Sequence, residues 1–78
     1  MIDVKAAVRL ATEYLRQLYP GPIEGVRLEE VELSNDEAFW YVTLSFLGDP
    51  PMPDREYKQF KMAAADGAIR YMKIRPLQ

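Results

Sequence analysis

The N-terminal part of this 78-residue chain contains one amphipathic stretch, and this stretch limits the chain to folds that begin with a single helix. Apolar residues recur there at three- and four-residue spacings, with charged residues between them: Val4, Ala7, Val8, Ala11, Leu15 and Leu18. Asp3 is suited to cap the N-terminus, and residues 20–22, Pro-Gly-Pro, interrupt the pattern. We therefore predict a helix from Val4 to Leu18 with one apolar face that the rest of the chain must cover.

The first of four strand-like runs that follow changes its apolar phase in the middle. Val26 and Leu28 occupy even positions, whereas Val31 and Leu33 occupy odd positions. A slip of one residue moves side chains to the other face of a strand unless an extra residue absorbs it. We therefore predict a β-bulge at residues 29–30.

Residues 34–37, Ser-Asn-Asp-Glu, predict a tight turn into the second run, residues 38–47. A two-residue turn would create three cross-strand pairs: Leu33 with Ala38, Val31 with Trp40 and, beyond the bulge, Leu28 with Val42. Alternate side chains of the second run would then face the helix and form the core, namely Trp40, Val42, Leu44 and Phe46.

The last two runs, residues 55–64 and 68–75, flank a turn in which Gly67 supplies a positive φ. Their inward face is ambiguous, because Phe60, Met62, Ile69 and Tyr71 can share one side while Tyr57, Met72 and Ile74 gather on the other. The whole chain, residues 1–78, is predicted to be one α+β domain in which a helix packs on a four-stranded antiparallel meander, αββββ.

A sheet with one helix has one covered face and one open face. Apolar and aromatic residues predicted on the open face form a candidate interaction face of Phe39, Tyr41, Tyr57, Met72 and Ile74. The alternative is that this face binds nothing, because strand twist and loops hide most of these side chains and the rest are isolated apolar residues on the surface. The proline-rich connections meet at one end of this topology and form a candidate binding rim, Pro22, Pro50, Pro51, Met52 and Pro53, unless they are only rigid connectors.

The chain contains no histidine and no cysteine, which removes the usual general base, the usual zinc ligand and the most nucleophilic side chain. Glu30 and Glu32 share a strand face and could bind a hard cation or act as an acid–base pair, but solvated surface glutamates are the simpler interpretation. No phosphate-binding loop or nucleophile motif is present. We therefore predict no enzyme activity, no cofactor and no metal.

The formal net charge of −2 argues against a nucleic-acid partner, which requires an excess of cations on one surface. The charge is unevenly distributed, since the first hairpin is acidic and the second is basic. Solvated strand faces explain this, and so does a charge-complementary contact between two copies of the chain. No export signal or membrane-spanning stretch is evident, so the predicted location is cytoplasmic.

Residues 57–62 and 66–75 form a strand, a glycine-containing turn and a final strand, a pattern that resembles the end of PepSY-type domains. The helix-plus-four-strand layout is also similar to the cystatin-like fold and to small uncharacterised bacterial proteins. The resemblance implies a small α+β domain that regulates or inhibits peptidases. The cystatin first-hairpin motif is replaced by residues 34–37, Ser-Asn-Asp-Glu, so no functional residue of that family is transferred.

Together these features predict a small non-enzymatic module that binds a protein, either another copy of itself or a peptidase-like partner. The alternative is a small-ligand binder that uses a cavity between helix and sheet near Trp40 and Tyr14.

Overall fold

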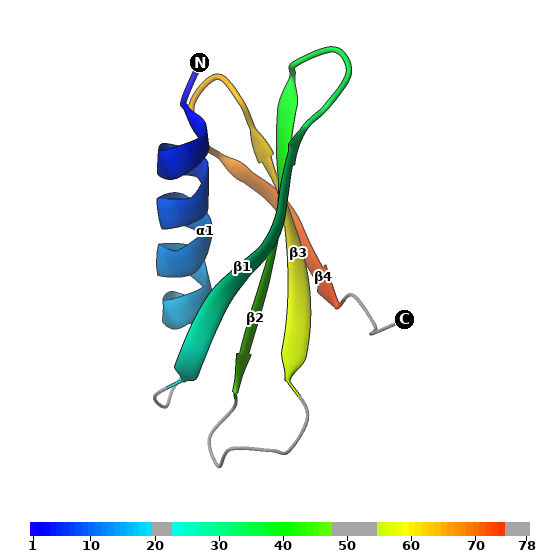
Figure 1. The fold of residues 1–78 in the computed structure, drawn as a ribbon. Helices are drawn as coiled ribbons and strands as arrows, with labels where there is room; N and C mark the ends of the chain where they lie inside the picture. The colour runs from blue at the N-terminus through cyan, green and yellow to red at the C-terminus, as the bar shows by residue number, and fades with distance from the viewer. Residues whose placement is uncertain (20–22, 48–54, 75–78) are drawn as a thin grey trace.

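The computed structural model describes residues 1–19, 23–47 and 55–74, which form a helix layer and a sheet layer (Figure 1). The helix α1 (Val4–Leu18) lies across one face of an antiparallel sheet with the order β1-β2-β3-β4. The strands are β1 (Glu24–Leu33), β2 (Phe39–Leu47), β3 (Glu56–Ala63) and β4 (Ile69–Ile74). This arrangement confirms the predicted α+β meander and the predicted bounds of the helix.

The helix begins at its predicted cap and presents small residues to the sheet. The Asp3 carboxylate accepts a hydrogen bond from the Ala6 backbone N–H at 2.8 Å, which satisfies one of the otherwise unpaired amides of the first turn. Ala7, Ala11 and Leu15 are fully buried. Because alanine has only a methyl group, α1 can lie close to the strands while Leu15 fills the space toward one end.

The core lies between α1 and the two central strands. Its largest fully buried side chains include Phe46 of β2 and Phe60 of β3. The Tyr14 ring meets the Phe60 ring edge-on at a centroid distance of 6.0 Å, which is a favourable aromatic arrangement. The Trp40 indole N–H donates to the Ile2 carbonyl at 3.2 Å, so the indole also ties down the start of the chain. The predicted core face of β2 is confirmed.

The bulge in β1 is confirmed, but the predicted register of the first hairpin is wrong. Between Leu28 and Glu30 the pairing with β2 skips one residue, Glu29. The observed partners are Leu33 with Trp40, Val31 with Val42 and Leu28 with Leu44, each displaced by two residues from the predicted pairs. A shift of two residues leaves each side chain on the same face of the strand. The predicted core residues of β2 are therefore correct although the predicted register is wrong.

The register differs because the connection is longer than a two-residue turn. Ser34 and Phe39 close it, since the Ser34 N–H donates to the Phe39 carbonyl at 2.8 Å and the Phe39 N–H donates to Ser34 Oγ at 3.0 Å. Inside this loop the Asp36 carboxylate accepts from the Ser34 hydroxyl at 2.7 Å and from the Ala38 N–H at 3.0 Å. Glu37 adopts the left-handed conformation, with φ 59°. Side-chain hydrogen bonds thus stabilise a wider turn than the sequence pattern indicated.

These hydrogen bonds predict a pH dependence of the turn. The Ser34 hydroxyl, and then the Ala38 amide, hold the pKa of Asp36 below its ordinary value of 3.8. A carboxylate with a lowered folded pKa stabilises the fold above the unfolded value, and this contribution disappears as the pH falls through the folded pKa. Asp36→Ala should therefore lower the urea midpoint at about pH 6, and the difference from wild type should shrink below about pH 3. The neighbouring loop variant Asn35→Ala serves as the control, and an unchanged Asp36→Ala difference at acidic pH would contradict the assignment.

A second bulge, at Arg70, decides the ambiguous faces of the last hairpin. Lys61 pairs with Tyr71, whereas the next residue, Met62, pairs with Ile69, so Arg70 is the extra residue. Ile69 therefore lies on the helix side, and Tyr71 lies on the opposite face. The predicted turn at Gly67 is confirmed by its φ of 79°.

This bulge also corrects part of the candidate interaction face. Met72 pairs with Phe60 and packs against the core on the helix side. Ile74 pairs with Lys58 on the same side, and it is 71% exposed near the edge of the sheet. Neither residue lies on the open face, because the extra residue in β4 reverses the alternation that the sequence pattern assumed.

Candidate interaction face

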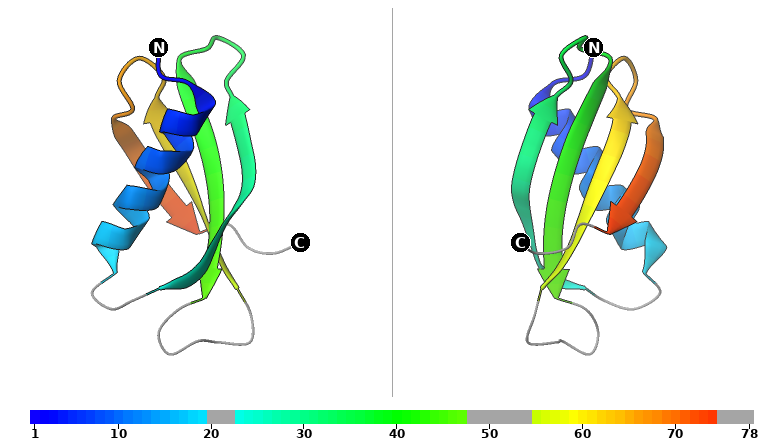
Figure 2. Two further views of the ribbon diagram at one scale, coloured as in Figure 1. Left: turned by 60° about the vertical axis from the view of Figure 1, so that its left-hand side comes forward. Right: turned by 90° about the vertical axis from the view of Figure 1, so that its right-hand side faces the viewer.

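Among the described residues, no helix or strand covers the face of the sheet opposite α1, which is turned toward the viewer in the right-hand view of Figure 2. Cross-strand partners share a face, and alternate residues along a strand do so too. The paired positions therefore define an open face made of Glu24, Arg27, Glu30, Glu32, Phe39, Tyr41, Thr43, Ser45, Leu47, Tyr57, Gln59, Lys61, Ala63, Tyr71 and Lys73.

A cluster of aromatic rings surrounds one lysine on β3 of the open face. The Lys61 ammonium lies 4.1 Å from the centroid of the Phe39 ring and 5.8 Å from the centroids of both Tyr41 and Tyr71. The Lys73 ammonium lies 5.1 Å from the Tyr71 centroid. Since a cation within about 6 Å of an aromatic face is attracted by the ring, these contacts hold the amines against the sheet. The result is a partly buried aromatic and cationic surface over β2, β3 and β4.

The β1 side of the same face is acidic. Glu30 and Glu32 stand beside a shallow hollow of about 240 Å³, whose lining is Glu30, Val31, Glu32, Tyr41, Thr43 and Gln59. Carboxylates at this spacing can accept hydrogen bonds or pair with cations. Within the described ranges, no group of three or more acidic residues is placed to hold a metal ion. The open face therefore runs from carboxylates on β1 to amines on β3 and β4.

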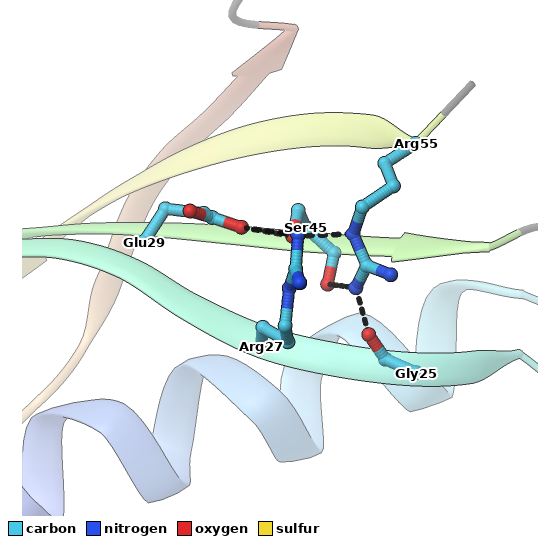
Figure 3. Close-up of polar contacts among 5 residues, drawn as sticks. All are labelled: Gly25, Arg27, Glu29, Ser45 and Arg55. Atoms are coloured by element: carbon cyan, nitrogen blue, oxygen red, sulfur yellow. Dashed lines mark hydrogen bonds and ion pairs between the residues drawn. The ribbon is translucent and has the colours of Figure 1, made fainter.

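A polar network closes the other end of the open face, near the start of β3 (Figure 3). Ser45 of β2 is fully buried, and its hydroxyl donates to Glu29 Oε2 at 2.5 Å and accepts from Arg55 Nε at 2.9 Å. Arg55 Nη2 donates to the carbonyl of Gly25 and to that of Ser45. Glu29 also forms an ion pair with Arg27 at 3.4 Å. The network links three neighbouring strands and occupies both hydrogen-bonding functions of the Ser45 hydroxyl.

Sequence reasoning missed this network. It treated Arg55 only as part of a basic hairpin and Glu29 only as part of a bulge. The available signal was the bulge itself, because an extra residue in an edge strand can re-aim its side chain toward the neighbouring strand. Glu29 is that extra residue, and its carboxylate reaches Ser45 across the β1–β2 pair.

The structure brings together only part of the predicted interaction face. Phe39, Tyr41 and Tyr57 lie on the open face and are partly buried. Tyr71, which the sequence pattern allowed to share a side with Phe60 and Met62, joins them. All residues of the candidate binding rim lie outside the described residues, namely Pro22, Pro50, Pro51, Met52 and Pro53.

The basic second hairpin is less uniform than its sequence indicates. Lys58 pairs with Leu44 on the helix side and is only 8% exposed, and its ammonium lies 3.8 Å from the Glu56 carboxylate. The lysines that carry positive charge on the open face are therefore Lys61 and Lys73, and not Lys58. The Arg70 guanidinium adds to this charge, since it lies 6.0 Å from the centroid of the Phe39 ring.

Burial, and then the nearby charge of Glu56, raise the pKa of Tyr19 above its ordinary value.

The ligand-binding alternative near Trp40 and Tyr14 gains no specific support from the geometry. The Trp40 indole N–H donates to the Ile2 carbonyl, and the Tyr14 ring packs on Phe60. A hollow of about 410 Å³ lies elsewhere, between α1 and β1, and its lining is Val4, Lys5, Val8, Arg9 and Leu28. It is an open apolar groove on the surface, and it differs in position from the predicted cavity.

Comparison with known proteins yields no match to a family model, a curated protein or a solved structure. The resemblance to PepSY-type and cystatin-like domains therefore stays a prediction. In the part of the chain that the structure describes, no helix has the length and apolarity needed to cross a membrane.

Proposed function

We propose that this chain is a small protein-binding module that acts through the open face and carries out no catalysis of its own. The observation that carries this proposal is the cluster of Phe39, Tyr41 and Tyr71 around Lys61, on a sheet face that no described element covers. Aromatic residues are enriched in protein interfaces, where they combine apolar area with polar groups at their ends. The proposed setting is the cytoplasm.

The absence of catalysis is part of the same proposal. The chain lacks histidine and cysteine. The buried serine of the open face, Ser45, has its hydroxyl engaged by Glu29 and Arg55. The remaining functional groups on this surface include carboxylates, amines, phenols, the Thr43 hydroxyl and the Gln59 amide, which are groups that a polar protein interface uses for hydrogen bonds and ion pairs.

Tyr41→Ala should disrupt binding through the open face. Tyr41 lies at the centre of the β2 row, between Glu32 of β1 and Lys61 of β3. A buried aromatic side chain at the centre of an interface commonly contributes at least about 2 kcal/mol to the binding free energy. Its loss raises the dissociation constant roughly thirtyfold. Light scattering over a concentration series of the full chain measures this directly, because self-association raises the mean mass.

Gln17→Ala, on an exposed position of α1, truncates a side chain away from the open face and is the control. Circular dichroism verifies that each variant is folded. A dimer that Tyr41→Ala dissociates while Gln17→Ala leaves it intact supports the proposal. A dimer that persists in Tyr41→Ala would assign the interface to another surface, and a wild-type chain that stays monomeric at millimolar concentration would remove self-association as the mode of binding.

A further inference from the structure

We propose that the partner of the open face is a second copy of this chain, related by a two-fold axis that runs parallel to the strands. This inference rests on the proposed function and deepens it by specifying the partner and its orientation. It follows from the order of charges across the sheet, which is acidic on one edge strand and basic on the other.

The strand pairing places these charges in two rows across the open face. One row runs from Glu32 through Tyr41 and Lys61 to Tyr71, and the next runs from Glu30 through Thr43 and Gln59 to Lys73. Each of these two rows begins with a carboxylate on β1 and contains an amine on β3 or β4. The neighbouring row begins with Arg27, whose charge is paired with Glu29 of the same strand. Because the charge changes from negative on β1 to positive on β3 and β4, this face is complementary to a second copy of itself that is turned so that its β4 faces β1.

Symmetry then selects the orientation. Two copies that meet face to face with aligned strands are related by a two-fold axis that lies between the sheets, either parallel to the strands or across them. An axis across the strands places β1 against the β1 of the second copy, which opposes Glu30 and Glu32 to themselves. An axis parallel to the strands places β1 against β4 and β2 against β3. Like charges directly opposed are unfavourable, so the charge order favours the parallel axis.

In that orientation the two rows make complementary contacts. Glu30 lies opposite Lys73 of the second copy, and Tyr41 lies opposite Lys61 of the second copy. Each contact occurs twice, because a two-fold axis makes the interface self-complementary and closes the assembly at two chains. The aromatic cluster lies near the centre of this interface, and the ion pairs lie at its sides.

Edge-to-edge pairing of β1 with β4 would also join an acidic strand to a basic strand, but the structure disfavours it. Both edge strands carry a bulge, one at Glu29 and one at Arg70. A bulge interrupts the row of backbone groups that an added strand must pair with. Head-to-tail edge pairing would moreover generate open chains of molecules and not a closed dimer.

A charge-swap experiment tests the orientation. We expect Lys73→Glu and Glu30→Lys each to raise the dimer dissociation constant at least about tenfold, because each places like charges opposite one another at two symmetric positions. The double variant Glu30→Lys/Lys73→Glu should return to within about threefold of wild type, since the pair is restored with its signs reversed. Analytical ultracentrifugation at low ionic strength gives the constants, and the exposed helix variant Lys5→Glu is the matched control.

The outcomes separate the orientation from the function. Rescue in the double variant supports the parallel axis. Dissociation by Tyr41→Ala without charge-swap rescue overturns the orientation and leaves the open face as the interface. A monomeric wild type overturns this inference, and binding of that monomer to a single-stranded oligothymidine probe, lost in Tyr41→Ala, would make the aromatic cluster a nucleic-acid surface instead.

Discussion

Phe60→Ala should remove a large part of the free energy of unfolding. Phe60 is fully buried in the middle of β3, pairs with Val42 and Met72, and receives the edge of the Tyr14 ring. Truncation of a buried phenylalanine costs about 3–5 kcal/mol, because the cavity that remains closes only partly. A domain of this size has a total stability of roughly 4–12 kcal/mol, so the loss ranges from about a quarter of that stability to all of it.

Phe39→Ala is the matched control for this variant. Phe39 has the same side chain but lies on the open face, partly exposed and in contact with the Lys61 ammonium. Its removal should cost only about 1 kcal/mol, from lost contact area and the lost cation–π interaction. Urea denaturation followed by circular dichroism, at one low protein concentration so that association does not contribute, measures both. Equal losses for the two variants would show that the two faces of the sheet are wrongly assigned.

Gly67→Ala is expected to be the second most damaging change. Gly67 has φ 79°, a conformation that costs other L-residues about 1–2 kcal/mol. A methyl group at this position would also lie 2.4 Å from Leu10 Cδ1 and 3.3 Å from Ile2 Cδ1, so these side chains would have to move. Displacement of packed side chains adds about 1–3 kcal/mol, for a total of about 2–5 kcal/mol.

The effect of Gly67→Ala should reach the start of the chain. Near this turn the Ile2 N–H donates to the Ala64 carbonyl at 2.8 Å, and the Gly67 N–H donates to the Ala63 carbonyl at 2.7 Å. In the variant, the backbone amides of Ile2 and of residue 67 should therefore exchange faster than in wild type. The reason is that the same displacement loosens both of these hydrogen bonds.

Gly25→Ala separates backbone strain from the steric clash. Gly25 also has a positive φ, 62°, but its nearest neighbour for an added methyl group is Arg55 Nη1 at 3.2 Å, the flexible end of a side chain. It should lose only about 1–2 kcal/mol, mainly from strain. In a domain of this size each kcal/mol shifts the melting temperature by about 4–8 °C, so thermal melts distinguish the two variants. A Gly67→Ala melting temperature equal to that of Gly25→Ala would contradict the predicted clash with Leu10.

A dimer through the open face would matter for a chain this small. A 78-residue domain with one helix and one sheet buries a limited apolar area, and it depends on each core side chain. Association adds stability by mass action, so the melting temperature of a self-associating chain should rise with its concentration. The charge order across the face would make such an association sensitive to salt, which screens exposed ion pairs.

The sequence by itself determined the features that depend on local periodicity. The helix from Val4 to Leu18, its cap at Asp3, the core face of β2 and the bulge between Leu28 and Glu30 all follow from spacing and residue type. These features are predictable because a helix or strand that buries one face must repeat its apolar residues at a set period.

The tertiary structure alone decided which partners the strands take and which side the last strand presents. Two closures of the first hairpin place the same side chains toward the helix, and the hydrogen bonds of Asp36 select the longer one. In β4 a single extra residue, Arg70, moves Met72 and Ile74 to the helix side and Tyr71 to the open face. Arg55 reaches Gly25 and Ser45 only because three strands lie side by side. Such pairings join residues distant in sequence, and their energies depend on contacts that no local pattern encodes.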